Sequence, residues 1–141
     1  MNDTNDISLH SAQQHYTKIF APWIQDLNIT IDHIDNENVV MTLPYDDKLC
    51  RVGGIICGQA LMALIDTCMV YVCFIGHKKF IDCATVNQNT SFLRPAINTP
   101  VTATGRVVKS GRTLVFGEVL LQDQNAKSIC NATLTYAVMP S

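Results

Sequence analysis

The chain has 141 residues, of which 48% are hydrophobic and 16% charged, and its net charge at pH 7 is −2. This length fits a single domain, and the composition excludes a disordered chain and indicates extra buried surface at a subunit interface. The sequence has no basic block and no interleaving of basic with aromatic residues. Nucleic acid is therefore not expected as a partner.

Cysteine and histidine usage bears on the compartment and on metals. The polar, acidic stretch from Met1 to Asp6 does not resemble a signal peptide. None of the six cysteines forms a C-x-x-C pair, and three lie inside an apolar run, which is typical of small buried hydrophobes in a reducing environment. We therefore expect a cytoplasmic protein. The four histidines have no ligand spacing, so we expect no metal and no cofactor.

The first elements in chain order are a helix and two strands. Ser8 is a candidate cap for a helix whose apolar residues recur at helical spacing until Pro22 ends it. Strands are predicted at 29–34 and 39–43, separated by a turn-rich cluster at 35–38.

The longest apolar run extends from Ile55 to Ile75. It is too long for a strand and apolar nearly all round, which predicts a helix buried on most sides, from about Ile56 to about Ile75. Gln59 and Asp66 are its only strongly polar side chains, and they lie two turns apart on nearly the same stripe.

Asp66 is the most informative residue of the run. An ionised carboxylate buried without a partner costs several kcal/mol, so it either takes up a proton or finds donors, and both outcomes suit acid/base or nucleophilic work. Three other readings stay open. The run is long enough to span a bilayer, although the central Asp and the lack of basic flanks argue against a membrane. In the second reading, Asp66 has a purely structural role, with a cap, a backbone amide or an Arg as its partner. In the third, it is simply exposed at a helix edge.

After Lys79 the hydrophobic period changes to two. Thr85 and Asn87 fall on one face of a strand ending near Phe92, and three more strands follow at about 101–109, 113–122 and 130–138. The order of elements predicts an α+β hotdog fold, in which an antiparallel β-sheet wraps around one long central helix. Residues 1–141 are treated as one such domain, with residues 1–24 as an N-terminal helical segment.

Three stretches of the sequence carry a family pattern. They are R-V-G-G-I-I-C-G-Q-A-L-M-A-L-I-D-T from Arg51 to Thr67, F-L-R-P-A from Phe92 to Ala96, and G-R-T-L-V-F-G-E-V from Gly111 to Val119. Together they resemble the PaaI-like (phenylacetate-type) hotdog acyl-CoA thioesterases, over about residues 29–140.

The resemblance implies roles for three residues. Asp66 corresponds to the base or nucleophile of the family. The Gly58 N–H, at the start of the central helix, would point at the thioester carbonyl, where helix-terminal donors favour negative charge. Thr85 takes the position that helps to hold water or substrate. Sites in this family lie between subunits, so the resemblance also implies a homodimer or homotetramer.

The sequence departs from the family pattern at three positions. Cys57 stands where the family has a His, Gln59 replaces the second glycine of the His-Gly-Gly turn, and Arg51 corresponds to a loop Asn. This variant is similar to a subgroup lacking the His, with R-x-G-G upstream. The Asp role carries over better than the full site.

Other residues of the pattern have competing interpretations. A thiol at a helix N-terminus invites a nucleophile reading for Cys57, but no paired base is evident and a space-filling role is favoured. Gly53-Gly54 lacks the Lys-Ser/Thr of a phosphate loop and more simply permits a tight loop. Arg94 and Arg112 suit either a CoA phosphate or salt bridges. The residues proposed to bind substrate are Gln59, Thr85, Cys57, Arg51, Asn87, Arg94 and Arg112.

The preferred function is hydrolysis of an acyl-CoA thioester to a carboxylic acid and CoA, with Asp66 as base or nucleophile and the Gly58 amide as oxyanion donor. The alternative is a non-hydrolytic acyl-CoA or fatty-acyl binding module, which the loss of the family His and Asn favours. A hotdog dehydratase or hydratase is the weakest reading, because no His falls in the segment leading into the helix.

Overall fold

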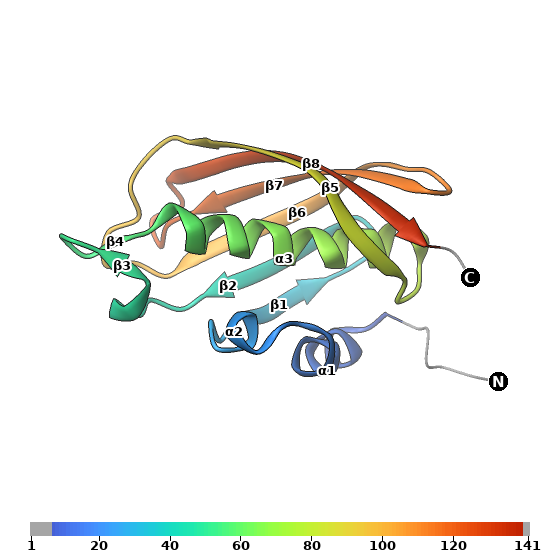
Figure 1. The fold of residues 1–141 in the computed structure, drawn as a ribbon, viewed down its shortest axis with the longest axis horizontal. Coiled ribbons are helices and arrows are strands. Elements are labelled where there is room, and N and C mark those ends of the chain that lie inside the picture. Colours follow the sequence, from blue (N-terminus) through green and yellow to red (C-terminus); the bar gives the residue numbers. More distant parts are fainter. Residues whose placement is uncertain (1–6, 140–141) are drawn as a thin grey trace.

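A six-stranded antiparallel sheet curves around one long helix, α3 (Gly58–His77), in the computed structural model, which describes residues 7–139 (Figure 1). This is the α+β hotdog arrangement that the sequence predicts. The strand order is β1-β2-β6-β7-β8-β5. The strands of the sheet are β1 (Thr30–Ile34), β2 (Asn38–Leu43), β5 (Asp82–Phe92), β6 (Val101–Ser110), β7 (Leu114–Gln122) and β8 (Ser128–Met139).

Two helices precede the sheet. Ser8 caps α1 (Leu9–Ile19) in a reciprocal capping box with Ser11, as the sequence predicts for Ser8. Helix α1 ends at Ile19, before Pro22, and Pro22 is the first residue of the short helix α2 (Pro22–Gln25). The α1 helix is tied to α3 by the Tyr71 hydroxyl, which donates to the Ala12 carbonyl at 3.0 Å.

The central helix begins and ends two residues later than predicted. Ile56 is not helical, because Ile55–Ile56 (β4) pairs with Cys50–Arg51 (β3) in a small hairpin that follows the 3-10 turn η2 (Asp47–Leu49). The helix also runs past Gly76 and ends where Lys78 adopts a left-handed conformation, with φ 59°.

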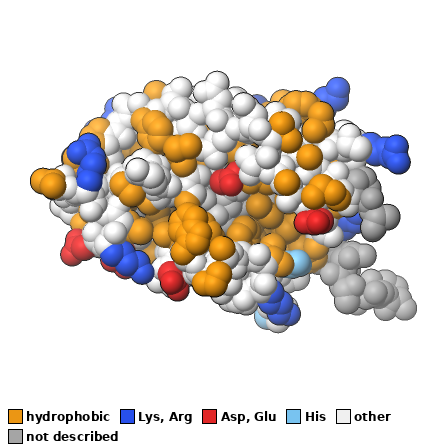
Figure 2. Space-filling model, viewed as in Figure 1, with side chains coloured by type: hydrophobic (Ala, Val, Ile, Leu, Met, Phe, Trp, Pro, Cys, Tyr) orange, Lys and Arg blue, Asp and Glu red, His pale blue; other side chains and the backbone are white. Residues whose placement is uncertain are grey.

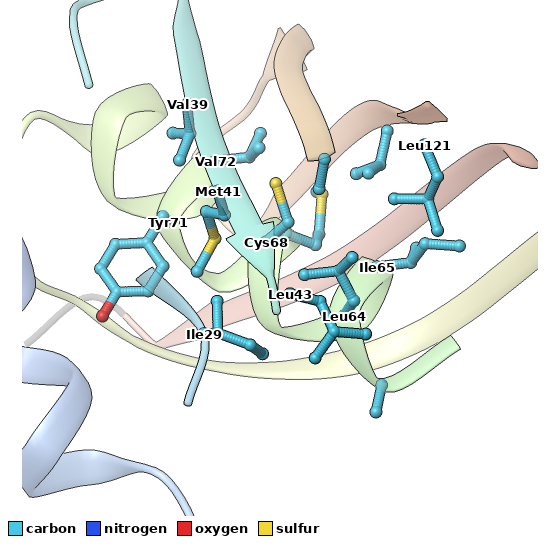
Figure 3. Packing of buried hydrophobic residues seen from close by; sticks show 14 of the residues in the cluster. Ile29, Val39, Met41, Leu43, Leu64, Ile65, Cys68, Tyr71, Val72 and Leu121 are labelled. Atoms are coloured by element: carbon cyan, nitrogen blue, oxygen red, sulfur yellow. The ribbon is translucent and has the colours of Figure 1, made fainter. Parts of the chain in front are cut away.

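Close packing of α3 on the sheet depends on two glycines in the middle strands. Figure 3 shows Leu64, Ile65, Cys68, Tyr71 and Val72 of the helix among buried side chains of the sheet. A Cβ atom built at Gly105 of β6 would lie 2.7 Å from the Cys68 sulfur, and one at Gly117 of β7 would lie 2.6 Å from the Met69 sulfur. Any residue larger than glycine at position 105 or 117 would therefore push the helix away from the sheet.

Strand β5 forms one edge of the sheet and is largely exposed. Within residues 7–139 it pairs only with β8, and the register shifts between Thr85 and Asn87. This bulge changes the expected alternation. Thr85 is opposite Tyr136, whereas Asn87 is opposite Thr135, so Thr85 and Asn87 point to different faces of the sheet.

Helix α3 is long and apolar enough to cross a membrane by length and composition, which was one reading of the sequence. In the fold, 67% of its most apolar window is buried inside the protein. It is mostly a buried core helix.

We predict that Gly105→Ala lowers the free energy of unfolding by about 1–3 kcal/mol, because the new methyl group overpacks the contact with Cys68 and Val72. Denaturant unfolding measures the change. Gly58→Ala is the matched control, since its Cβ would make an ordinary contact with the Phe92 ring at 3.5 Å. Equal stability of the two variants would contradict the close approach of helix and sheet.

Candidate active site

Two hydroxyl groups hold the Asp66 carboxylate, which projects from the middle of α3. The Tyr136 hydroxyl of β8 lies 2.6 Å from Oδ1, and the Thr85 hydroxyl of β5 lies 3.0 Å from Oδ1 and 3.2 Å from Oδ2. Asp66 itself is half-buried, and Thr85 is exposed. The structure thus brings together two of the residues that the sequence singled out, and it adds a third.

Strand pairing explains why the two hydroxyls meet at one carboxylate. Thr85 and Tyr136 are directly opposite each other on neighbouring strands, so their side chains emerge on the same face of the sheet, towards α3. Tyr136 lies on the buried, apolar face of β8, so the sequence pattern does not mark it as a site residue. Its hydroxyl was the available signal, because a buried phenol needs a hydrogen-bond partner.

The electrostatic setting of Asp66 is that of a carboxylate held by neutral donors. Within residues 7–139, no Lys, Arg or His forms an ion pair with it. Tyr136 is only 3% exposed, and burial together with its hydrogen bond to Asp66 raises the pKa of its phenol. The phenol therefore stays protonated and remains a donor at neutral pH.

A second group of predicted residues gathers at the N-terminal end of α3. Gly58 is the first helical residue, and Cys57, the capping residue, makes no side-chain capping hydrogen bond. The N–H groups of the first turn have no intrahelical acceptor and carry the positive end of the helix dipole. A pocket of about 490 Å³ lies here, and Gly58, Arg51 and Arg94 line it. Arg94 also donates to the Ser128 carbonyl at 2.9 Å.

The two groups are separated along the helix. Asp66 comes eight positions after Gly58, which at a rise of 1.5 Å per residue is about 12 Å along the helix. A thioester carbonyl held by the Gly58 N–H is therefore out of hydrogen-bond reach of the Asp66 carboxylate of the same chain. Gln59, also in the first turn, is exposed at the Gly58 end.

Two predicted residues lie away from both groups. Asn87 lines a hollow on the other face of the sheet, together with Phe116 and Thr135. Arg112 is in the turn after β6, where His77 at the C-terminal end of α3 contacts the Gly111 carbonyl at 2.9 Å. Arg112 is thus at the opposite end of the helix from Gly58.

An apolar pocket of about 440 Å³ lies along α3 beyond Asp66, on the side away from Gly58, and Asp66 itself does not line it. Val70, one helical turn after Asp66, lines it with Phe74, Phe80 and Cys83. His15 of α1 closes one wall, with its ring stacked on Phe80 at a centroid distance of 3.8 Å. Figure 2 shows hydrophobic side chains gathered across this face of the molecule, with few charged groups among them.

The described residues contain no cluster of three or more His, Cys, Asp or Glu side chains placed to hold a metal ion. All six cysteines lie in that part of the chain and all are free. The chemistry open to the site is therefore that of a carboxylate, two hydroxyls and a helix N-terminus.

The chain is similar to known proteins in sequence and in fold. A model of the Thioesterase superfamily matches residues 53–130, more than half of the chain. A candidate esterase of Thermoplasma acidophilum is 29% identical over 128 residues, covering 86% of this chain and 92% of its own.

Solved structures show the same fold. The PaaI protein of the Escherichia coli phenylacetic acid degradation operon superposes with a TM-score of 0.80 at 19% identity, covering 92% of this chain and 93% of its own. A thioesterase-like protein of Streptococcus pneumoniae, solved with coenzyme A, superposes with a TM-score of 0.71 at 23% identity, over 81% and 88% of the two chains.

Proposed function

Because the chain belongs to the Thioesterase superfamily, we propose that it hydrolyses an acyl-CoA thioester to a carboxylic acid and CoA. The observation that carries the proposal is the Asp66 carboxylate, held by two neutral hydroxyls and paired with no cation in residues 7–139. A carboxylate in this state is free to accept a proton or to attack a carbonyl carbon.

The reaction takes one of two routes at Asp66. In the first, Asp66 accepts a proton from water as the water oxygen bonds to the thioester carbon; the C–S bond then breaks and the proton passes to the departing CoA sulfur. In the second, an Asp66 oxygen attacks the carbon, expels CoA and forms an anhydride, which water hydrolyses. Both routes yield the acid and the thiol, and both place negative charge on the carbonyl oxygen.

We assign stabilisation of that charge to the Gly58 N–H of a second copy of the chain. The Gly58 and Asp66 groups of one copy are about 12 Å apart along the helix, so they serve one carbonyl only when two copies contribute one group each. Strand β5 supplies a free sheet edge next to Asp66, and pairing of such edges is how a homodimer forms. A homotetramer would be built from two such dimers.

The two pockets suit the two parts of the substrate. The apolar pocket beyond Asp66, lined by Val70, Phe74 and Phe80, has the size and character to take an acyl group. The pocket at the helix N-terminus, with Arg51 and Arg94, offers positive charge for the CoA phosphates. Cys57, the capping residue, and Gln59 flank Gly58 at the start of the helix, and in this proposal they contact the substrate there. In a reducing cytoplasm the free cysteines remain thiols.

The alternative is an acyl-CoA binding module without turnover, which the absence of the family His and Asn at Cys57 and Arg51 favours. Hydrolysis of a panel of short, medium and aromatic acyl-CoAs, followed by free-thiol release, separates the two functions. Thiol release at a rate proportional to protein supports the hydrolase. Saturable binding without release supports the module.

The decisive variant is Asp66→Asn, which keeps the shape of the side chain and, through Oδ1, most of its hydrogen bonding, but has no charge to act as base or nucleophile. Turnover should fall by about two to four orders of magnitude while acyl-CoA affinity is kept. Steady-state kinetics and a melting curve measure both effects. A folded variant with wild-type turnover would contradict the proposed role of Asp66.

The Gly58 donor is tested by Gly58→Pro. Proline is favoured at the first helical position, and Cys57 before it already has the extended conformation that proline requires, with φ −68° and ψ 151°. The substitution therefore removes the N–H while fitting the start of the helix, and turnover should fall by about two to three orders of magnitude. Gly58→Ala, which keeps the N–H, should stay near wild type.

Mixing the two inactive variants tests whether the site is shared. In a mixed dimer one of the two sites combines an intact Asp66 with an intact Gly58, so random mixing should restore about a quarter of wild-type turnover. Co-expression of the two chains with different tags gives the mixture. A mixture as inactive as its parents would rule out a site built from two copies.

Cys57 is expected to fill space and contact substrate rather than act as nucleophile. Cys57→Ala should retain most of the turnover, since the thiol makes no capping hydrogen bond. The measurement is the same thiol-release assay, with a melting curve as control. A loss as deep as that of Asp66→Asn in a folded protein would make the thiol the reacting group.

A further inference from the structure

We propose that Tyr136 is a positioning residue that fixes the Asp66 carboxylate by binding Oδ1, so that Oδ2 is the oxygen that reacts. The inference rests on the proposed role of Asp66 as base or nucleophile. It assigns a function to a β8 side chain that the sequence pattern places with the core.

The contacts of the two carboxylate oxygens are unequal. Oδ1 accepts from the Tyr136 hydroxyl at 2.6 Å and is 3.0 Å from the Thr85 hydroxyl, whereas the contact to Oδ2 is the longer 3.2 Å one from Thr85. The Thr85 hydroxyl has one proton to give, and Oδ1 is the nearer acceptor. Most of the free lone-pair capacity of the carboxylate is therefore on Oδ2.

The Tyr136 hydroxyl also fixes the orientation of the side chain. It lies 2.9 Å from the backbone carbonyl oxygen of Asp66 as well as 2.6 Å from Oδ1. A single hydroxyl thus contacts the backbone and the side chain of one residue, which restricts rotation about the bonds between them. The contact to Oδ1 is the shorter of the two and its acceptor is charged, so the Tyr136 hydroxyl donates its proton mainly to Oδ1.

Tyr136 gives up no proton in this role. Burial and the neighbouring carboxylate raise the pKa of the phenol, so it is a donor throughout the working range of the enzyme. Its ring is 3% exposed on the apolar face of β8, and a phenylalanine would fill the same space. Only the hydroxyl distinguishes a positioning role from a packing role.

A matched pair of variants separates these roles. Tyr136→Phe removes the donor to Asp66, and Tyr71→Phe removes another buried tyrosine hydroxyl, which donates to the Ala12 carbonyl at 3.0 Å. Both lose one hydrogen bond in the core, but only the first touches the carboxylate. We expect Tyr136→Phe to lower kcat about tenfold with KM changed less than about twofold, the loss of one charge-assisted hydrogen bond.

The pH profile of kcat/KM is the second readout. Loss of a donor disfavours the ionised carboxylate, so the acid limb should move to higher pH in Tyr136→Phe and stay in place in Tyr71→Phe. Site-specific replacement of Tyr136 by 3-fluorotyrosine keeps the ring and its packing but makes the phenol a stronger donor. The acid limb should then move to lower pH, and this variant decides the question if Tyr136→Phe does not fold.

Two results would overturn the inference in different ways. An unchanged kcat and acid limb in Tyr136→Phe, with turnover lost in Asp66→Asn, removes the positioning role and leaves the proposed function intact. Wild-type turnover in Asp66→Asn removes the proposed function, and the inference falls with it. A loss of kcat that is equal in Tyr136→Phe and Tyr71→Phe, without a shift of the acid limb, makes the hydroxyl structural.

Discussion

The close approach of α3 to the sheet is the contact on which the rest of the structure depends. Gly105 and Gly117 leave space for Cys68 and Met69 of the helix, so the helix backbone comes close to the sheet. A threonine reaches Asp66 only at such a distance. The same packing that buries the apolar faces of the helix thus places β5 and β8 against its single carboxylate.

The way in which the carboxylate is satisfied determines what it can do. A buried Arg or Lys partner would form a strong ion pair, and breaking that pair during a reaction would leave an uncompensated charge. Neutral hydroxyls donate hydrogen bonds to Asp66 but hold its negative charge less strongly than a cation would. In addition, β5 is an edge strand, so one side of the carboxylate is open where a central strand would have covered it. The Asp66 carboxylate is thus hydrogen-bonded within the protein and still accessible from one side.

The sequence predicts most of the fold because its patterns are local. The Ser8 cap, the period-two strands and the long apolar helix are each written in neighbouring residues, and each is present in the structure. The boundaries of α3 were wrong by two residues, because the β4 pairing and the left-handed Lys78 depend on contacts that hydrophobic periodicity does not contain.

The candidate site is harder to predict because its contacts are distant in sequence. The resemblance implies that Thr85 holds water or substrate, and in the structure its hydroxyl contacts Asp66. Tyr136 is 70 residues from Asp66 and is indistinguishable by pattern from its apolar neighbours. Asn87 shows the reverse problem. Simple alternation places it beside Thr85, and a bulge turns it to the other face, where nothing in the composition of β5 marks the extra residue.

The sheet edge next to Asp66 connects assembly to chemistry. Strand β5 contributes Thr85 to the carboxylate and also carries the unpaired backbone groups of an edge, with Val86 and Phe92 exposed along it. An exposed edge of this kind is normally paired or blocked, and here no charged side chain lies between Thr85 and Phe92 to block it. In the proposed dimer, a second copy paired along β5 would bring its own helix to the same place. In the proposed site that helix supplies the Gly58 N–H, so formation of the dimer and completion of the oxyanion site would be one event.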